Sequence, residues 1–289
     1  MTMEAQYRLC PVCGGRPAKT FEKRGHIIGV CTDCAHMFVA NRLSPNHLEQ
    51  VYNDTYFTGG GDGYPDYLGE EDLLVAHGRR YGRLLKRYMP AGRVLDIGAA
   101  AGFILKGLTE AGWSGDGVEP NTSMAKVAQE KYGLHVQIGA LEDVVVDEQY
   151  DAVTMIQVAA HFHDVRRAFE IVARATKSGG WWLIETADKD SLPARLLGQN
   201  WHFISPPSVQ NWFSRTTLAN LARQFSMTPV ATGRPQKWLN GAHAKSLMSH
   251  KIQGSLGTVI SPVLRVIPDD LPIPYPSFDL MWILLRKAS

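Results

Sequence analysis

The sequence has little excess charge and no long uninterrupted apolar run. Its 30 Lys and Arg against 28 Asp and Glu leave a formal net charge of +2 over 289 residues, so it lacks the concentrated positive field behind most non-specific binding to nucleic acid. No stretch approaches the roughly 18 consecutive apolar residues that predict a membrane-spanning helix, and the first ten residues lack the pattern of a signal peptide. We therefore expect a cytoplasmic protein without a membrane partner, and nucleic acid is disfavoured as a ligand.

Cysteine is absent after residue 34, and the four cysteines before that point lie close together in the sequence. They form two CxxC pairs, Cys10 with Cys13 and Cys31 with Cys34, which are separated by seventeen residues. In a reducing compartment such pairs are better explained by thiolate ligation than by disulfides, and four thiolates match the tetrahedral preference of zinc. The pattern predicts a structural zinc ribbon over residues 1–40.

The length allows one large domain with a small appendage, because single cores usually stop growing at roughly 250 to 300 residues. Residues 41–71 are rich in glycine, asparagine, aspartate and tyrosine, which predicts a linker that forms a lid. Residues 72–289 then form the main domain. Within the lid segment, Tyr64 and Tyr67 could close over a ligand or only anchor the loop, and both interpretations stay open.

From residue 93 onward, short apolar runs alternate with helical patterns. Strands are expected at 93–98, 115–120, 135–139, 150–157, 181–186 and 278–287, and helices at 72–88, 103–112, 121–133, 164–177 and 216–225. Asn121 is placed to cap one of these helices and Gly133 to end it. Alternation of this kind predicts a doubly wound α/β fold, with a parallel sheet covered by helices on both faces. The section 228–270 is expected to be irregular.

The first of these strands ends in VLDIGAAAG, where Asp96, Gly98 and Gly102 mark a sharp turn into a helix. Small residues there let the backbone approach a ligand, and the helix start offers free N–H groups. Glu119 ends the second strand 23 residues after Asp96, in the position from which a carboxylate accepts hydrogen bonds from two ribose hydroxyls. The loop 98–102 lacks the middle glycine of GxGxxG, so we expect a nucleotide-like cofactor other than NAD.

The segments VLDIGAAAGFIL, GVEP, GALED, YDAVTMIQVAAHFHDV and KSGGWWLIET resemble successive motifs of class I S-adenosylmethionine-dependent methyltransferases, over roughly residues 90–230. The cysteine ribbon and the stretch 191–221 further resemble bacterial small-molecule methyltransferases, and the ribbon plus core is similar to sugar C-methyltransferases. The resemblance implies a Rossmann-like, seven-stranded sheet with S-adenosylmethionine as cofactor. It also implies a small-molecule acceptor, such as a sugar nucleotide or a natural-product or polysaccharide intermediate, held by insertions around 188–215 and 235–275.

The same resemblance implies roles for individual residues. Those expected to bind the cofactor are Asp96, Gly98, Ala99, Ala100, Gly102, Glu119, Pro120, Leu141, Glu142 and Gln157. Among these, Glu119 would hold the ribose and Leu141 and Glu142 would border the adenine. Asp96, Gly98 and Gly102 would line the methionine end, with Gln157 near it.

Histidines are the expected catalytic residues. His161 matches a histidine that the family commonly has in an EH pair, although Ala160 stands in place of the glutamate. An oxygen or carbon acceptor must lose a proton, and a histidine with an ordinary pKa near 6.5 is a workable base. His161 ranks first because it follows the strand end that should face the methyl group, ahead of His202 and His163. A histidine that only packs or caps a helix is an equally open interpretation of His161.

Three other functions stay open. A ribosomal RNA methyltransferase would use the ribbon to grip a hairpin, although the small net charge counts against it. An NAD-linked oxidoreductase is disfavoured by the missing glycine and by a turn expected at 177–180, before the fifth strand. A protein that binds the cofactor without catalysis stays possible because Ala160 departs from the family pattern.

Overall fold

The structure is a computed structural model that describes residues 7–41, 51–59, 64–147, 149–245 and 268–289. Its central layer is a seven-stranded sheet in the order β10-β13-β8-β7-β4-β5-β6. The parallel strands are β4 (Arg93–Ile97), β5 (Ser114–Glu119), β6 (His135–Ile138), β7 (Tyr150–Ile156) and β8 (Thr176–Ala187). At the other edge, β13 (Leu280–Lys287) runs antiparallel to β8, and β10 (Met227–Gly233) runs antiparallel to β13. The doubly wound, seven-stranded fold is confirmed.

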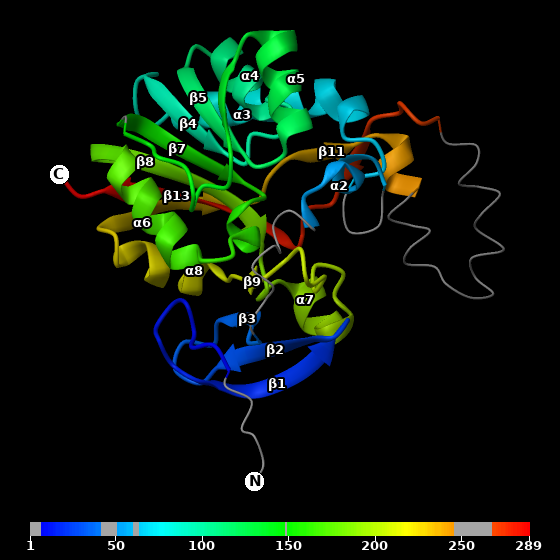
Figure 1. Ribbon diagram of the computed structural model, residues 1–289, viewed down its shortest axis with the longest axis vertical. Helices are drawn as coiled ribbons and strands as arrows, with labels where there is room; N and C mark the ends of the chain where they lie inside the picture. The colour runs from blue at the N-terminus through cyan, green and yellow to red at the C-terminus, as the bar shows by residue number, and fades with distance from the viewer. Residues whose placement is uncertain (1–6, 42–50, 60–63, 148, 246–267) are drawn as a thin grey trace.

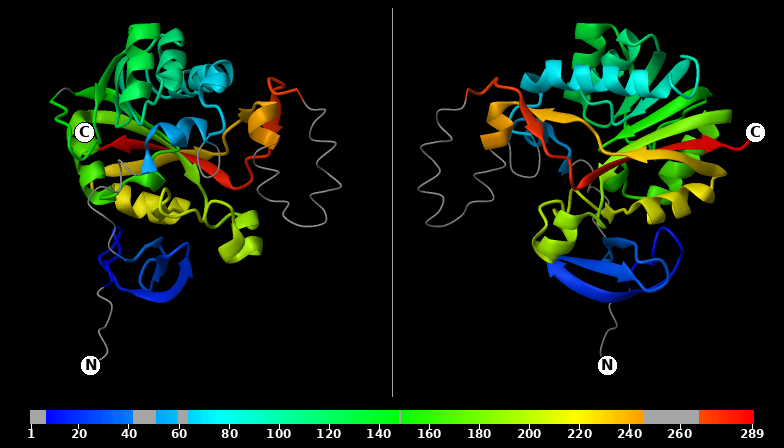
Figure 2. Two further views of the ribbon diagram at one scale, coloured as in Figure 1. Left: turned by 45° about the vertical axis from the view of Figure 1, so that its right-hand side comes forward. Right: turned by 180° about the vertical axis from the view of Figure 1, so that it is seen from behind.

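Helices cover both faces of this sheet, as Figures 1 and 2 show. One face carries α3 (Glu71–Leu85), α4 (Phe103–Glu110) and α5 (Thr122–Tyr132), and the other carries α6 (Val165–Ala175) and α8 (Arg215–Arg223). Because both faces are covered, the central strands are apolar and buried on both sides, with Leu95, Val153 and Ile184 at 0 to 1% exposure. β5 and β6 lie on one side of β4 and β7 and β8 on the other, so the strand order reverses at β4. The carboxyl ends of β4, β5 and β7 therefore form the edge where such sheets bind ligands.

The termini of α5 follow the sequence prediction. The Asn121 side chain accepts a hydrogen bond from the backbone N–H of Met124, and Gly133 ends the helix in a left-handed conformation with φ of 63°. Asn121 directly follows the turn after Glu119, so this cap also fixes the chain beside the sheet edge.

Two expectations about strands were wrong. The section 228–270 is not irregular throughout, because it contains most of β10 and also β11 (Lys237–Leu239), which pairs with β12 (Ile273–Tyr275); its residues 246–267 lie outside the described part of the chain. β10 is an edge strand with alternating exposure and a proline, so it has no apolar run to reveal it. The residues 177–180, expected as a turn, lie inside β8, where Gly179 has φ of 72° and the register with β7 shifts.

The cysteine-containing segment forms a second, four-stranded sheet in the order β1-β2-β3-β9. Its own strands are β1 (Pro17–Lys23), β2 (His26–Cys31) and β3 (Met37–Val39). The fourth strand, β9 (Asn211–Trp212), comes from the main domain and pairs antiparallel with β3. Figure 1 shows β9 between the ribbon and the main domain. A division at residue 40 therefore separates chain segments that share one sheet.

Short helices complete the described structure. They include α2 (Asp54–Thr58), α7 (Leu192–Leu197) and the single turns η1 (Leu68–Glu70), η2 (Ala159–His161) and η3 (Gly198–Asn200), and residues 241–245 are helical as well. Within the described ranges, no helix combines the length and the apolar character needed to cross a membrane.

Candidate functional site

A cavity of about 1060 Å³ opens at the carboxyl edge of the sheet. This volume lies at the upper end of the roughly 300 to 1,000 Å³ found for sites that hold one small ligand. Its walls come from the strand ends, from the segment 52–67, from the insertion 197–212 and from the tip of the β1–β2 hairpin. The cavity is therefore large enough for two small molecules side by side.

Seven of the ten expected cofactor residues line this cavity, namely Gly98, Ala100, Glu119, Pro120, Leu141, Glu142 and Gln157. Asp96, Ala99 and Gly102 do not line it. Asp96 instead accepts a hydrogen bond from the hydroxyl of Thr154 at 2.6 Å, and Gly102 begins α4 in a left-handed conformation. In this structure these three residues shape the loop around the site from behind.

Glu119 is almost fully buried, with 4% of its surface exposed. Its Oε2 accepts from the backbone N–H of Ala100 at 2.8 Å, and its Oε1 accepts from that of Asn121 at 2.7 Å. A carboxylate has about four acceptor positions, so two remain for hydroxyl donors. Burial raises the pKa of Glu119 to about 7, and it raises that of Asp96 to about 7 as well. Two hydroxyl donors would stabilise the ionised form of Glu119.

Gln157 ends β7 in a left-handed conformation, with φ of 58°. Its Nε2 donates to Oε1 of Glu185 at 2.7 Å. Oε2 of Glu185 contacts Nε2 of His77 at 2.7 Å and accepts from the hydroxyl of Tyr81. Because the amide nitrogen of Gln157 is turned toward Glu185, its amide oxygen is the atom that can accept a hydrogen bond from a ligand.

Glu185 was not among the predicted site residues. Burial alone would raise its pKa, but the adjacent His77 and the hydroxyl of Tyr81 hold the pKa of Glu185 at about 2. His77 and Tyr81 lie on α3, more than 100 residues earlier in the chain. One sequence signal was available, since Glu185 directly follows the apolar run 181–184, and a carboxylate buried there requires a partner.

His161 lies in η2, directly after β7, and lines the cavity. Its Nδ1 is 2.9 Å from the carbonyl oxygen of Ser208. A carbonyl oxygen can only accept, so Nδ1 carries the proton and Nε2 has a free lone pair. The hydroxyl of Tyr52 donates to the same carbonyl at 2.9 Å and lies 2.8 Å from Nδ1. Burial lowers the pKa of His161 to about 4, which keeps the ring neutral at physiological pH.

The two other candidate histidines lie in different places. His202 lines the cavity, with Nε2 at 3.3 Å from the hydroxyl of Tyr275 and at 3.5 Å from Oδ2 of Asp279. His163 does not line the cavity, and its carbonyl oxygen accepts from the guanidinium of Arg8 in the ribbon. Of the three, only His161 and His202 are therefore placed to meet a ligand.

Aromatic side chains of the segment 52–67 form one wall of the cavity, namely Tyr52, Tyr56, Phe57, Tyr64 and Tyr67. The ring of Tyr67 stacks on Phe103 of α4, with centroids 5.3 Å apart. Nδ2 of Asn121 donates to the carbonyl oxygen of Tyr52 at 3.0 Å and to Oδ1 of Asp54 at 3.1 Å. The segment is thus attached to the loop that follows Glu119, and Tyr64 and Tyr67 face the site as a lid would require.

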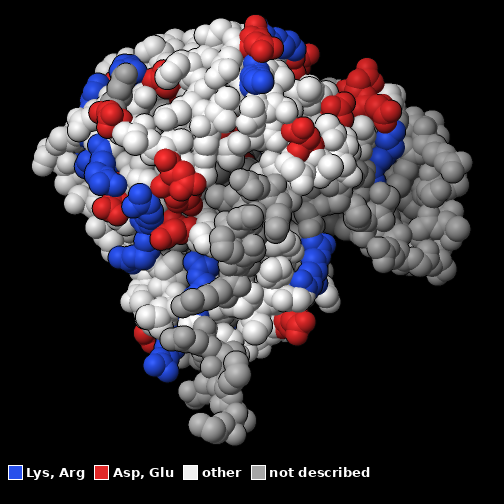
Figure 3. Space-filling model, in the orientation of Figure 1, with Lys and Arg blue, Asp and Glu red and all other residues white. Residues whose placement is uncertain are grey.

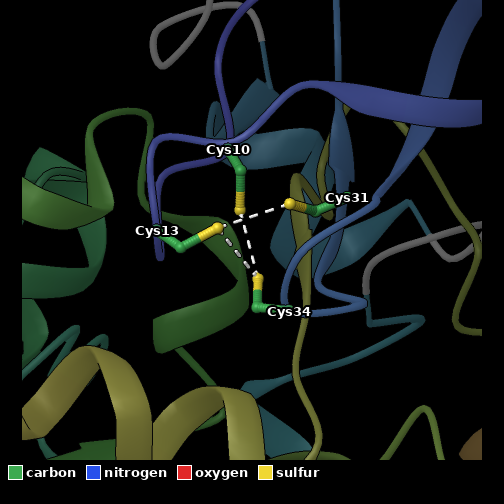
Figure 4. Close-up of side chains that lie close together, drawn as sticks. All are labelled: Cys10, Cys13, Cys31 and Cys34. Carbon is green, nitrogen blue, oxygen red and sulfur yellow. Dashed lines mark hydrogen bonds between the residues drawn. The ribbon is translucent and has the colours of Figure 1, made fainter.

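The four cysteines converge at one end of the ribbon (Figure 4). Their Sγ atoms all lie within 4.8 Å of one another, and the shortest separations are 3.3 Å for Cys13 to Cys31 and 3.3 Å for Cys13 to Cys34. Tetrahedral zinc with Zn–S bonds of about 2.3 Å holds its sulfurs about 3.8 Å apart. The donor set and its spacing therefore fit zinc, and four protein ligands would leave no open position for water.

Comparison with known sequences gives a consistent result. A family model described as a methyltransferase domain matches residues 74–231. The uncharacterized methyltransferase YcgJ of Bacillus subtilis is 28% identical over 197 residues, covering 64% of this chain and 74% of that protein. A ubiquinone biosynthesis O-methyltransferase of Nitrobacter winogradskyi is 29% identical over 151 residues, covering 46% of this chain. The chain spans about half of this second relative, 54% of its length.

Solved structures show the same fold. An S-adenosylmethionine-dependent methyltransferase from Archaeoglobus fulgidus matches with a TM-score of 0.51 at 19% identity, over 76% of this chain and 99% of the other. The structure of YcgJ from Bacillus subtilis also matches with a TM-score of 0.51, at 18% identity, over 74% of this chain and 99% of the other.

Proposed function

This chain belongs to the methyltransferase family whose domain model covers residues 74–231, and from that premise we propose that it methylates a small molecule. It is an S-adenosylmethionine-dependent methyltransferase. The acceptor we propose is a sugar nucleotide or a natural-product or polysaccharide intermediate. The relative named for ubiquinone biosynthesis supports an acceptor of small-molecule size.

One observation carries this proposal. A single cavity extends from Glu119 at the sheet edge, past His161, to the insertion 197–212. A cofactor held at the sheet edge and an acceptor held by the insertion would then meet inside one enclosure. Methyl transfer needs this arrangement, because the acceptor atom must approach the methyl group in line with the bond that breaks.

S-adenosylmethionine supplies an electrophilic methyl group on a positively charged sulfur. We propose that Glu119 accepts from the ribose hydroxyls, that Leu141 and Glu142 border the adenine, and that the amide oxygen of Gln157 accepts from the methionine end. Asp96 in β4 and Ala99 and Gly102 in the loop that follows would support this site from behind its wall. The aromatic wall of the segment 52–67 would exclude water from the reacting atoms.

His161 is the proposed base. Its Nδ1 proton is committed to the carbonyl oxygen of Ser208, so Nε2 can take a proton from the acceptor. The ring is neutral before the reaction because burial lowers the pKa of His161 to about 4. The imidazolium form of His161 is unfavourable because the ring is buried. His161 would therefore hold the proton only briefly or pass it on. His202, beside Tyr275 and Asp279, is the alternative base at the acceptor end.

The ribbon over residues 1–40 is proposed to hold a structural zinc through Cys10, Cys13, Cys31 and Cys34. Residues 41–71 would act as a lid, and 72–289 as the methyltransferase domain with acceptor insertions around 188–215 and 235–275. Four reduced cysteines are typical of a reducing compartment, which supports the proposed cytoplasmic location.

An RNA acceptor has no comparable support. On the face drawn in Figure 3, Lys and Arg side chains are interspersed with Asp and Glu and do not gather into a broad basic surface. RNA-binding proteins usually present such a surface to the phosphate backbone.

Calorimetric titration of the purified protein with S-adenosylhomocysteine and, separately, with NAD tests the proposal. We expect binding of S-adenosylhomocysteine in the micromolar range and no binding of NAD. Binding of NAD alone would overturn the proposal. Nucleotide sugars and a structured ribosomal RNA fragment are then tested separately as acceptors of a labelled methyl group. The compound that becomes labelled decides between the two classes of acceptor.

A further inference from the structure

The charges around the cavity are divided between its two ends. Among the described lining residues, the carboxylates are Glu119 and Glu142, and both lie at the end proposed for the cofactor. The lining cations are Lys23, Arg24 and Lys237, none of which comes from the cofactor-binding loops. Lys23 and Arg24, at the tip of the β1–β2 hairpin, therefore give the acceptor end a positive lining, whereas Lys237 lies on β11.

Two of these cations come from the cysteine-containing ribbon. Lys23 ends β1 and pairs in register with His26, which begins β2. Arg24 and Gly25 form the turn between them, with φ of 49° and 75°, the positive values of a tight hairpin turn. Nζ of Lys23 donates to the carbonyl oxygen of Gln199 in η3 at 3.0 Å. The hairpin tip is thus fixed against the acceptor insertion, beside α7 in Figure 1.

Lys23 can donate further hydrogen bonds besides the one that it gives to Gln199. An ammonium group has three protons, and the bond to Gln199 uses one of them. Arg24 already makes a contact of its own, and its guanidinium has five N–H donors in a planar fork, enough to bind phosphate oxygens as well. The ammonium of Lys23 and the planar guanidinium of Arg24 lie on adjacent residues. Together they form a suitable binding site for a group with several anionic oxygens.

The other walls at this end are aromatic. Trp201, Phe203 and Trp212 line the cavity, and the indole nitrogens of the two tryptophans already donate to Asp279 and to the carbonyl oxygen of Phe203. Both tryptophans are almost fully buried, at 1% exposure, and contact the partly exposed Phe203, whose ring offers flat apolar surface to a sugar or base. The combination of aromatic wall and adjacent cations suits a ligand with one flat part and one anionic part.

The ribbon also determines where this wall lies. β3 pairs with β9 through Met37 opposite Trp212 and Phe38 opposite Asn211. Nε2 of the buried His36 lies 3.4 Å from Oδ1 of Asn211. The same small module therefore positions the hairpin cations and holds the strand that contains Trp212.

We propose that the ribbon is part of the acceptor site and that Lys23 and Arg24 bind a phosphate or diphosphate group of the acceptor. This inference rests on the proposed function, and it narrows the acceptor to phosphate-bearing molecules. The cysteine cluster would then contribute to acceptor binding indirectly. It would hold the β1–β2 hairpin in place at the cavity and would take no part in methyl transfer.

The test uses the full-length protein saturated with S-adenosylhomocysteine and titrated with uridine diphosphate, inorganic pyrophosphate and citrate. We expect both phosphate compounds to bind and citrate to bind more weakly. The double variant Lys23→Ala, Arg24→Ala should bind both phosphate compounds about tenfold more weakly or worse. The matched control is Lys19→Ala, which removes a cation from β1 that does not line the cavity.

The affinity for S-adenosylhomocysteine is measured in every variant, and it should not change. If the wild type binds S-adenosylhomocysteine but neither phosphate compound, or if the double variant binds them as the wild type does, the inference is wrong while the proposed function stands. Citrate binding as tight as pyrophosphate binding would overturn the assignment to phosphate. A wild type that binds no S-adenosylhomocysteine would remove the proposed function and the inference with it. Tighter binding of uridine diphosphate than of pyrophosphate would assign a base to the aromatic wall.

Discussion

Glu119 has an ionisation state that changes near neutral pH. Burial raises its pKa to about 7 in the ligand-free protein, and the ionised carboxylate accepts hydrogen bonds from hydroxyls better than the protonated acid does. Raising the pH through 7 therefore increases the fraction of protein ready to bind. We expect the affinity for S-adenosylhomocysteine to rise about tenfold between about pH 6 and about pH 8, measured by calorimetry.

The variant Glu119→Gln isolates this effect, since it cannot ionise. It should bind S-adenosylhomocysteine about tenfold or more weakly at pH 8, with little dependence on pH. Glu110→Gln is the control, because Glu110 forms a surface ion pair with Arg79 and should behave as the wild type. An equally steep pH profile in Glu119→Gln would show that another group is responsible.

His161 is predicted to hold its proton on Nδ1 and to remain neutral. Its Nδ1 faces the carbonyl oxygen of Ser208, and its pKa is lowered to about 4 by burial. Nitrogen NMR spectra should therefore show the Nδ1–H tautomer, with chemical shifts that do not move between about pH 5.5 and about pH 8. Once the acceptor is known, His161→Gln should lower kcat by about 10² to 10⁴.

The variant also assigns the NMR signal of His161, because that signal disappears. The affinity for S-adenosylhomocysteine should stay the same, which separates a catalytic role from a general loss of structure. An Nε2–H tautomer, or titration near neutral pH, would contradict the proposed base. Exposed His135→Gln is the control and should leave kcat unchanged.

The site residues that could be predicted from the sequence are those at or just after the carboxyl end of a predicted strand, because these ends form the ligand-binding edge of the sheet. Glu119 ends β5, Gln157 directly follows β7 and His161 lies in the short turn η2 after it, and all three line the cavity. Tyr52 and Glu185 could not be assigned in this way. Tyr52 meets His161 across 109 residues of chain, and Glu185 meets His77 across 108, and no local pattern specifies such pairings.

At the scale of elements, one side chain joins α5 to the lid segment. Oδ1 of Asn121 caps α5, while its Nδ2 donates to Tyr52 and Asp54. Serine caps helices about as well as asparagine but has no amide donor. We expect Asn121→Ser to keep the cap of α5, and so to melt above Asn121→Ala, and to release S-adenosylhomocysteine up to about thirtyfold faster, because two hydrogen bonds of about 1 kcal/mol each are lost from the closed lid.

Stopped-flow displacement measures the release rate, and calorimetry or circular dichroism measures the melting temperature. Asn121→Ala is the comparison variant, since it loses the cap as well and should also lower the stability of the protein by about 1 kcal/mol. If Asn121→Ser releases the ligand at the wild-type rate, the segment 52–67 does not act as a lid through this contact.

The accuracy of element prediction depended on local signals. α5 has a capping asparagine before it and a glycine after it, and its observed bounds match the predicted ones closely. β10 has neither an apolar run nor clear boundaries, because half of its side chains face solvent at the sheet edge. The start of β8 was missed because Gly179 and Gly180 are typical of turns, whereas here they belong to a bulge within the strand.

At the scale of the whole molecule, the ribbon and the main domain are joined through the pairing of β3 with β9. The side chains of β1 are mostly exposed or half-buried, so the ribbon has little core of its own and should depend on metal ligation for its order. The core of the seven-stranded sheet around Leu95, Val153 and Ile184 comes mainly from its own strands and helices, and ribbon residues such as Phe38 pack against one side of it. Loss of zinc should therefore affect the acceptor side of the cavity and spare the cofactor side.

We predict one zinc ion per chain by metal analysis, and its removal with a strong chelator should have a local effect. Amide hydrogen exchange should become faster in residues 26–39 and in β9, because the ribbon no longer supports that pairing. Exchange in β4 and β7, and the affinity for S-adenosylhomocysteine, should remain as in the untreated protein. Cys13→Ser should reproduce the effect of the chelator, whereas Thr32→Ser, a change between the two cysteines of the second pair, should not. Unchanged protection of β9 after zinc removal would mean that the ribbon stays folded without metal, and the cysteine cluster would then need another explanation.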